Sequence, residues 1–427
     1  MGMYELAKEL FPICRSITGN GVRATLQIIK REIPQLQIHA VKSGTKVFDW
    51  VIPDEWNIEE AYIEDESGKR LIDFQENNLH VMGYSEPVDK WVDKEELLRH
   101  IFSLPEQPDY IPYVTSYYKK QYGFCMTDNM RKKLENGTYH ILIKSSFKVG
   151  ELNYGEIIIP GRSKKEVFLS TYICHPSMAN NELSGPCVLV NIAKYLQSLP
   201  DRRYTYRLLF TVETIGAITY LQKNLEQMKE NVIAGFNISC VGDDRTYSYV
   251  ESRYGHTLSD RVCQNVLKYH YPEYKRYTYL DRGSDERQYC APGVDLPVCA
   301  ICRSKYGEYA EYHTSADDLS LISEEGLEGA YKVYVKCINA LEYNYKYKIK
   351  CLCEPQLGKR GLYPTVSKKN IYDEVRKMTN FIAYADGNND LIEISDRINV
   401  SIEELIPIID RLEKADLLIR GEENAGQ

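Results

Sequence analysis

The chain has 427 residues, of which 43% are hydrophobic and 27% charged, and its formal net charge at pH 7 is −8. This length exceeds what one hydrophobic core usually serves, so we expect two or three globular domains. The acidic balance disfavours nucleic-acid binding, because phosphate recognition needs a concentrated basic surface, and it favours small-molecule partners.

The amino-terminal segment, MGMYELAKELFPICRSITG, lacks the basic and then apolar layout of a secretory signal. No stretch reaches the roughly 18 apolar residues of a membrane span, so we expect a cytoplasmic protein without a membrane segment. Four of the twelve cysteines lie in apolar runs, where a reduced thiol behaves as a small buried hydrophobe: Cys187, Cys240, Cys299 and Cys337. The CAIC motif has zinc-ligand spacing but no second pair at a matching distance, so we interpret it as strand.

Within the first 130 residues, the sequence pattern changes from helical to strand-like near residue 45. Residues 1–44 predict two helices, whereas residues 45–130 contain short alternating strands, a DESGKR turn and frequent aromatic residues. The second pattern is typical of an antiparallel domain. Because the two helices would pack naturally on the α/β segment that follows, we interpret residues 45–130 as a small β domain inserted into a larger one.

Residues 131–349 alternate strand-like and helix-like segments. Apolar runs rich in β-branched or aromatic residues predict strands at 166–173, 206–212, 231–241 and 295–303, with helical patterns such as 183–199 between them. Such alternation predicts a mostly parallel sheet with helices on both faces. We therefore expect an α/β domain built from residues 1–44 and 131–349.

Residues 350–427 predict a winged helix-turn-helix unit, with the residues NVS at the turn between two helices. DNA binding is one interpretation of such a unit. Across residues 390–420, however, eight acidic residues stand against four basic ones, and the helix that would enter a DNA groove is itself acidic. We therefore expect no nucleic acid partner and favour a packing or dimerisation module, which allows a homo-oligomer through this domain.

Polar residues follow each of the four predicted strands. They are His175, Glu213, Asp243 with Asp244, and His313 in the motif YHTSADD. Functional groups gather beyond the carboxyl ends of parallel strands, so we expect these side chains to meet. Two imidazoles and carboxylates are the usual ligands of zinc, and a further carboxylate is then available to act on a water molecule.

The motifs CHP…NNELSG, VETIG, SCVGDD, GSDERQY and YHTSADD resemble, in this order, the co-catalytic zinc aminopeptidase family. The resemblance covers roughly residues 130–345 together with the amino-terminal helices. With the β insert and the winged helix, the chain resembles the subgroup of polysaccharide biosynthesis proteins with an aminopeptidase-like domain. The resemblance implies a metalloprotease fold in which His175 and His313 are metal ligands and Glu213 is the general base.

Three acidic metal ligands of that family are replaced here by neutral residues: Asn181, Thr214 and Ser239. Two dications about 3.5–4 Å apart need carboxylates to offset their repulsion, so a tight two-metal centre is not expected. The resemblance then implies one zinc ion held by both histidines and by one or both of Glu182 and Asp243. The alternative is a pseudoenzyme whose ligands have decayed.

The loop GSDERQY borders the substrate in the resembled family. An acid at Asp285 or Glu286 could hold a substrate amine, and Arg287 could bind a carboxylate in a bidentate manner. Arg253, in VESRYG, is a fourth candidate. A solvated turn and a surface salt bridge are the structural alternatives for these residues.

Tyrosines cluster at residues 110–124 and 268–283, where they would line either a substrate groove or a domain junction. The leading functional hypothesis is a metal-dependent hydrolase that cleaves an amide or peptide bond in a small peptide or another small amine-bearing substrate. A non-catalytic binding or scaffold protein in polysaccharide assembly is the second hypothesis. A transcription regulator is the third, and the acidic helix counts against it.

Overall fold

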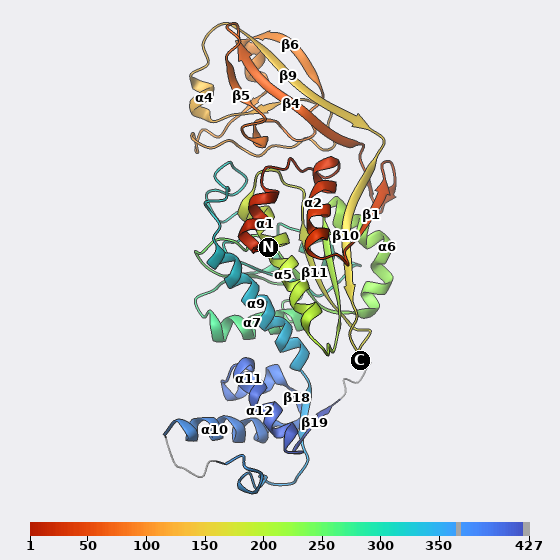
Figure 1. The fold of residues 1–427 in the computed structure, drawn as a ribbon, viewed down its shortest axis with the longest axis vertical. Helices are drawn as coiled ribbons and strands as arrows, with labels where there is room; N and C mark the ends of the chain where they lie inside the picture. Colours follow the sequence, from red (N-terminus) through yellow and green to blue (C-terminus); the bar gives the residue numbers. More distant parts are fainter. Residues whose placement is uncertain (364–368, 422–427) are drawn as a thin grey trace. The chain divides into compact units, whose positions relative to one another are not determined.

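The computed structural model describes residues 1–363 and 369–421. Its internal contacts divide the chain into two compact units. The first comprises residues 1–255 and 275–331, and the second comprises residues 256–274 and the chain from residue 332 onwards. The first unit contains the central sheet and the β domain shown in Figure 1.

An eight-stranded sheet with the order β1-β10-β12-β11-β13-β16-β14-β15 lies at the centre of the first unit. The strands are β1 (Gln37–Lys42), β10 (Glu151–Ile159), β11 (Glu166–Tyr172), β12 (Thr205–Thr211), β13 (Val232–Asn237), β14 (Ser248–Val250), β15 (Lys275–Tyr277) and β16 (Val298–Cys302). The middle strands β12, β11, β13 and β16 are parallel, whereas β1 and β10 add an antiparallel edge. The predicted α/β class is confirmed.

Helices cover this sheet, and every residue of β11 is buried, as expected for a strand packed on both faces. The helices are α1 (Met3–Leu10), α2 (Asn20–Glu32), α5 (Ser184–Ser198), α6 (Ile215–Asn231), the short α8 (Glu286–Tyr289) and the start of α9 (Glu324–Tyr343). α5 packs on β11 and β12, and α1 packs on α5, as predicted for the amino-terminal helices. Loops follow the carboxyl ends of the parallel strands and form that edge of the sheet.

A four-stranded antiparallel sheet with the order β5-β4-β9-β6 forms the β domain (Figure 1). It contains β4 (Glu55–Asp65), β5 (Arg70–Asp73), β6 (Val88–Asp93) and β9 (Thr138–Lys148), and smaller elements accompany it: β2 (Lys46–Val47), β3 (Trp50–Val51), α3 (Lys94–Arg99), β7 (Ile101–Phe102), β8 (Phe124–Cys125) and α4 (Asp128–Lys132). Its inner face is apolar, with Ala61, Ile63, Ile141 and Ile143 buried. The predicted boundary at residue 130 precedes β9, which pairs with β4 and β6 and then continues into β10.

The second unit contains α7 (Leu258–His270), α10 (Lys369–Tyr384), α11 (Leu391–Ile398), α12 (Ile402–Lys414) and a sheet of β17 (Lys346–Ile349), β18 (Asp386–Asp390) and β19 (Leu418–Gly421). Asn399 ends α11 in the left-handed conformation that asparagine tolerates, and Ser401 caps α12 by accepting from the Glu404 N–H. The predicted winged helix-turn-helix is therefore confirmed.

The acidic start of α12 has partners inside this unit. Glu403 pairs with Lys336 of α9 and lies 3.3 Å from His270 of α7, and Glu404 pairs with Lys377 of α10. The amino-terminal end of α12, the helix that enters DNA in a winged-helix protein, thus forms ion pairs within this unit.

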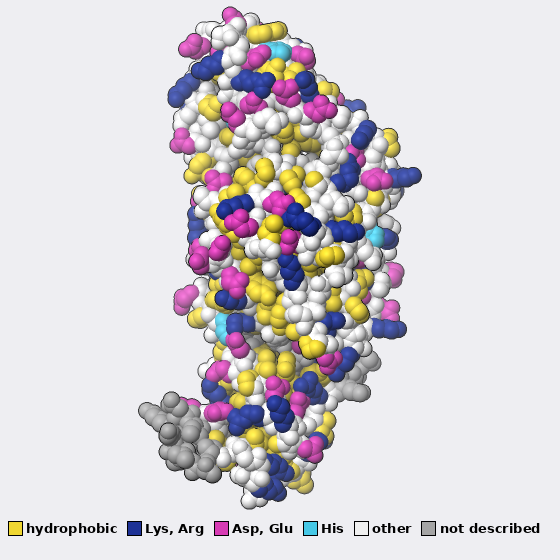
Figure 2. Space-filling model, in the orientation of Figure 1, with side chains coloured by type: hydrophobic (Ala, Val, Ile, Leu, Met, Phe, Trp, Pro, Cys, Tyr) yellow, Lys and Arg dark blue, Asp and Glu magenta, His cyan; other side chains and the backbone are white. Residues whose placement is uncertain are grey.

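Acidic and basic side chains are interspersed over the face shown in Figure 2. Within the described ranges, no helix has the length and apolar character that crossing a bilayer requires. All twelve cysteines are free thiols, and the four predicted to be buried are buried. The CAIC motif lies in β16, as predicted.

An arginine inside the central sheet has a full set of partners. Arg207 of β12 is only 1% exposed, and it donates to both Glu166 oxygens at 2.6 and 2.9 Å, to Glu156 at 3.0 Å and to the Tyr220 hydroxyl at 2.7 Å. Burying a charge is costly unless it is paired, so the sheet depends on this network.

We predict that Arg207→Met lowers the free energy of unfolding by about 3–5 kcal/mol, because it leaves the buried Glu166 carboxylate uncompensated. Urea unfolding followed by circular dichroism measures the change. Arg31→Gln is the matched control, since its partner Glu9 is at the surface, and it should leave the unfolding midpoint unchanged. Equal effects of the two substitutions would contradict the prediction.

Candidate active site

His175 lies just beyond the carboxyl end of β11, and its side chain is buried. The ring Nδ1 is 2.7 Å from Oε2 of Glu182, and the backbone carbonyl accepts two hydrogen bonds from the buried Arg15 guanidinium, at 2.8 and 3.1 Å. Glu182 lies in a π-helical turn, Ala179–Leu183, that leads into α5. The contact at Nδ1 fixes the ring and leaves Nε2 as its free edge.

The charge state of His175 follows from its neighbours. Burial by itself disfavours the imidazolium, but contacts with Cys174 and Glu182 outweigh it, and the pKa of His175 is raised well above its ordinary value. The thiol of Cys174 has its own pKa raised to about 11 by burial, so it is uncharged near neutral pH. Glu182 therefore supplies the negative charge that holds the proton on His175.

Cys174, His175 and Glu182 form a compact group of metal-ligand types. A cation does not suit this group, because the Arg15 Nε atom lies 3.9 Å from Oε1 of Glu182 and already provides a positive charge. The contact of 2.7 Å between Nδ1 and Oε2 is a hydrogen bond with the proton between the two atoms. Glu182 thus orients His175 rather than sharing a metal with it.

His313 lies across the cavity from His175, with ring centres 5.4 Å apart, and the Tyr113 ring is 5.1 Å from both. Its ring stacks on Tyr312, and its Nε2 atom is buried without a hydrogen-bond partner. Burial and the neighbouring His175 lower the pKa of His313 to about 3, so this imidazole stays neutral. A neutral ring with an unpartnered nitrogen is suited to bind a cation.

The β domain helps to position His313. The backbone carbonyl of His313 accepts from the Tyr113 N–H at 2.9 Å, and Ser315 N–H donates to the Ile111 carbonyl at 2.9 Å. The segment 110–117 is therefore bonded to the loop that carries His313, and its tyrosines are held over the site.

Glu213 follows β12 and faces the same space. Its Oε2 atom is 3.7 Å from Nε2 of His175, and its backbone N–H donates to the Cys174 sulfur at 3.2 Å. Burial raises the pKa of Glu213 above that of an exposed glutamate, although the His175 and Arg287 charges oppose the shift. A carboxylate with a raised pKa is suited to exchange protons near neutral pH.

A second network lies beside Glu213. Thr214 has φ 62° and ψ −80°, a strained backbone for a β-branched residue, and its N–H donates to Oδ1 of Asp285 at 2.8 Å. Arg287 donates from Nη2 to the Thr214 hydroxyl at 2.7 Å. Burial and the Glu213 carboxylate raise the pKa of Asp285 well above its ordinary value, although the Thr214 N–H and the Arg287 charge oppose the shift.

These groups border a cavity of about 450 Å³. Its polar lining comes from Cys174, His175, Glu213, Thr214, Arg287, Gln288, Thr115 and His313, and its aromatic lining from Trp50, Tyr113, Tyr117 and Tyr118. Tyr113 and Tyr117 share a hydrogen bond of 2.9 Å between their hydroxyls. Of the two tyrosine clusters, the one at residues 110–124 lines the cavity. None of the described lining residues comes from the cluster at 268–283.

The structure brings together five of the predicted site residues: His175, Glu182, Glu213, Arg287 and His313. Asp285 lies beneath them, bonded to Thr214. Three other candidates lie elsewhere, namely Asp243, Glu286 and Arg253.

Each of these three is held by other partners. Asp243 follows a strand that ends at Asn237 rather than at residue 241, and its carboxylate accepts from Asn180, Arg245 and Ser304. Glu286 accepts from Gly283, Ser284, Asn237 and the Tyr306 hydroxyl. Arg253 pairs with Asp295 and is absent from the cavity lining.

Two contributors were not predicted. Arg15 fixes the His175 backbone, and its signal in the sequence is only a lone arginine in an apolar segment. Asp317 accepts from the Asn180 and Asn181 N–H groups at 2.5 and 3.0 Å and so shapes the turn that presents Glu182. The position of Asp317 in the YHTSADD motif did not indicate that it would shape this turn.

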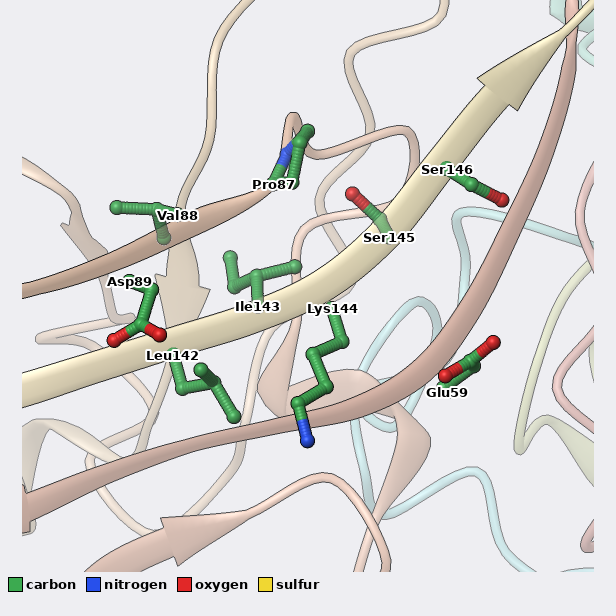
Figure 3. A pocket seen from close by; sticks show the side chains of 9 residues that line it. All are labelled: Glu59, Pro87, Val88, Asp89, Leu142, Ile143, Lys144, Ser145 and Ser146. Carbon is green, nitrogen blue, oxygen red and sulfur yellow. The ribbon is translucent and has the colours of Figure 1, made fainter.

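Another hollow, of about 410 Å³, lies on the β domain between β6 and β9 (Figure 3). Its charged residues, Glu59, Asp89 and Lys144, lie apart along the strands and do not converge on a point. The hollow is the more open of the two and lacks convergent polar groups, so we assign the functional site to the cavity at the strand ends.

Solved structures share this architecture. A Clostridium acetobutylicum crystal structure described as a peptidase matches with a TM-score of 0.92 and 43% identity, covering 98% of this chain and 96% of that one. A zinc aminopeptidase from Bacillus subtilis matches with a TM-score of 0.57 at 12% identity, covering 79% and 94%. A peptidase M28 precursor from Shewanella amazonensis matches with a TM-score of 0.56 at 10% identity, covering 83% and 94%. The protein thus has the zinc aminopeptidase fold that the motif order predicted.

The profile of the family described as Domain of unknown function (DUF4910) matches residues 4–344, and a winged helix-turn-helix profile matches residues 345–420. The chain belongs to the DUF4910 family. A curated relative from Clostridium acetobutylicum, whose name joins polysaccharide biosynthesis with an aminopeptidase-like domain, is 44% identical over 419 residues, covering 97% of this chain and 95% of the relative.

We predict that Glu182→Gln lowers the pKa of His175 in metal-free protein, because the substitution removes the charge that retains the proton. A pH titration of the labelled histidine rings by NMR measures it. A raised folded-state pKa means that this pair stabilises the fold fully below about pH 6.5, and that the contribution is lost as the pH rises through the folded value.

Two controls accompany this titration. Glu64→Gln removes a partner of His140, a histidine of the β domain, and should leave His175 unchanged. Cys174→Ala should lower the pKa of His175 by less than Glu182→Gln does, since a thiol that is uncharged near neutral pH carries no net charge. An unchanged His175 titration in Glu182→Gln would refute the assignment.

Proposed function

We propose that this protein is a metal-dependent hydrolase that cleaves an amide or peptide bond in a small amine-bearing substrate and uses a single zinc ion. The observation that supports the proposal best is the convergence of His175, Glu213 and His313 on one cavity. These residues come from three loops that are far apart in the sequence, and the buried Nε2 of His313 has no hydrogen-bond partner among the described residues, which leaves it available to a ligand.

The residues present offer two imidazole ligands to one zinc ion, one protein ligand fewer than catalytic zinc sites usually have, and they do not fit two ions. With zinc–nitrogen bonds of about 2.0–2.1 Å, two imidazoles on one tetrahedral ion have ring centres roughly 5 Å apart, close to the separation of 5.4 Å seen here. Glu182 on Nδ1 of His175 is the kind of carboxylate partner that metal-bound histidines usually have. A second ion would face Asn181, Thr214 and Ser239, which carry no charge to offset it.

His175 and His313 would hold the ion, which supplies Lewis acidity toward the scissile carbonyl and toward water. Asp243 has no part in this proposal, because its carboxylate is bonded elsewhere. Binding at Nε2 of His175 requires loss of the Nε2 proton from the imidazolium that Glu182 stabilises, so occupancy should fall as the pH falls.

Glu213 is the proton-transfer group. It lies beside Nε2 of His175, is partly exposed to the cavity and has a raised pKa, so it can take a proton from the attacking water and give it to the leaving amine. Tyr113 and its neighbours on the β domain cover the site and restrict it to small substrates.

A second candidate is a non-catalytic protein that binds an amine-bearing ligand in this cavity. The observation in its favour is the replacement of three acidic ligands, since Asn181 and Ser239 place buried polar atoms without partners where the family has carboxylates. The name of the Clostridium acetobutylicum relative, which refers to polysaccharide biosynthesis, accords with such a role.

We predict about one zinc per chain by elemental analysis of protein purified without chelator. Glu213→Gln should retain the metal and reduce hydrolysis of amino-acid amides by about 10²–10⁴-fold, the usual contribution of a general base. His313→Ala should lose the zinc. Arg253→Gln, outside the cavity, serves as the control with unchanged metal content and rate.

Wild-type protein that contains no metal, takes up none on addition of zinc and hydrolyses no amide would exclude the hydrolase and favour the binding protein. Loss of zinc in Glu213→Gln would instead make Glu213 a ligand and contradict its role as the base.

A further inference from the structure

Arg287 has an incomplete set of partners. It borders the cavity and is half-buried, and its hydrogen bond to the Thr214 hydroxyl is the one that the described residues provide. The Nε atom is buried and has no acceptor. No carboxylate in residues 1–363 or 369–421 lies within ion-pairing distance of this guanidinium.

Two buried arginines of the same unit, Arg207 and Arg15, show the usual pairing. Arg207 has three carboxylate contacts and a tyrosine, and Arg15 donates to the backbone carbonyls of His175 and Leu10. A buried charged donor is normally paired because its desolvation is otherwise uncompensated. Arg287 therefore has both charge and hydrogen-bonding capacity left for a group that enters the cavity.

The position of Arg287 is also fixed in advance. Arg287 donates a hydrogen bond to the hydroxyl of Thr214, and the backbone of Thr214 is in turn bonded to Asp285. Arg287 also lies in the short helix α8, which begins at Glu286. Glu286 is itself fully buried and bonded to Gly283 and the Tyr306 hydroxyl. A guanidinium held in this way loses little side-chain entropy when it binds an anion.

The aromatic part of the lining restricts the kind of ligand. Trp50, Tyr117 and Tyr118 form an aromatic wall of the same cavity, and they offer ring surface and hydroxyls but no further positive charge. One planar guanidinium suits a single planar carboxylate, which it can bind through two parallel N–H donors.

We propose that Arg287 is the carboxylate-binding residue of the cavity, and that the ligand is a small molecule with a free carboxylate close to its amide bond and a ring or apolar portion against the aromatic wall. Dipeptides and N-acyl amino acids share this chemistry. The inference rests on the proposed function, because it takes the cavity beside Glu213 as the substrate site.

The test compares a carboxylate with its amide in full-length protein made zinc-free with chelator, so that no turnover occurs. The probes are L-alanyl-L-tyrosine and L-alanyl-L-tyrosine amide, and binding is measured by isothermal titration calorimetry. Wild type should bind the acid at least about tenfold more tightly. Arg287→Gln should weaken binding of the acid by about 10–100-fold and leave the amide unchanged, as expected for loss of a charged hydrogen-bonded pair.

Two variants make the result specific. Arg287→Lys keeps the charge but not the planar pair of donors, so it should recover only part of the preference for the acid. Arg253→Gln removes an arginine that pairs with Asp295 outside the cavity and should behave as wild type. Unchanged amide binding in Arg287→Gln shows that the cavity has kept its shape.

Three results would overturn the inference. They are an equal affinity of wild type for acid and amide, an undiminished preference for the acid in Arg287→Gln, and no binding of either probe at concentrations up to about 10 mM. Because binding is measured without zinc, a preference lost in Arg287→Gln supports the inference even if amide hydrolysis is absent and the proposed function fails. Amide hydrolysis by a protein that shows no preference for the acid would support the proposed function and overturn the inference.

Discussion

The arrangement of the site depends on the hydrogen bond between His175 and Glu182, both buried at the edge of the sheet. Glu182 cannot be ionised there without compensation, and it has two positive partners, the imidazolium and the Arg15 guanidinium. Arg15 also binds the His175 carbonyl, so charge and backbone are fixed together. One consequence is that Nε2 of His175 faces the cavity, where Glu213 and His313 lie.

The same arrangement gives the two histidines different properties. His175 keeps its proton because an acid is bonded to it, and His313 remains neutral because it is buried beside that positive charge. In the family that the motifs resemble, acidic ligands balance two metal ions. Here Asn181 and Ser239 are neutral, and the acid Glu182 bonds to Nδ1 of His175, away from the Nε2 atom that faces the cavity.

Much of this was predictable. The run of apolar residues ending at His175 predicted a buried strand, and the order of motifs predicted the fold, because burial on both faces requires continuous apolar stretches. The meeting of His175 and His313 followed from the rule that the carboxyl ends of parallel strands share one edge. Glu182 and Asp243 were equivalent as nearby acids in the sequence. Only their hydrogen-bond partners distinguished them, one bonded to an imidazole and the other to Ser304.

The sequence by itself determined the α/β class, the β domain and the winged helix, since these depend on local periodicity and on turn residues. Tertiary structure decided the partner of each buried polar group. It paired Arg15 with the His175 carbonyl, and it left Arg287 without a carboxylate. The reason is physical: hydrogen bonds and ion pairs between distant segments depend on distances of a few ångströms, which only the packed chain sets.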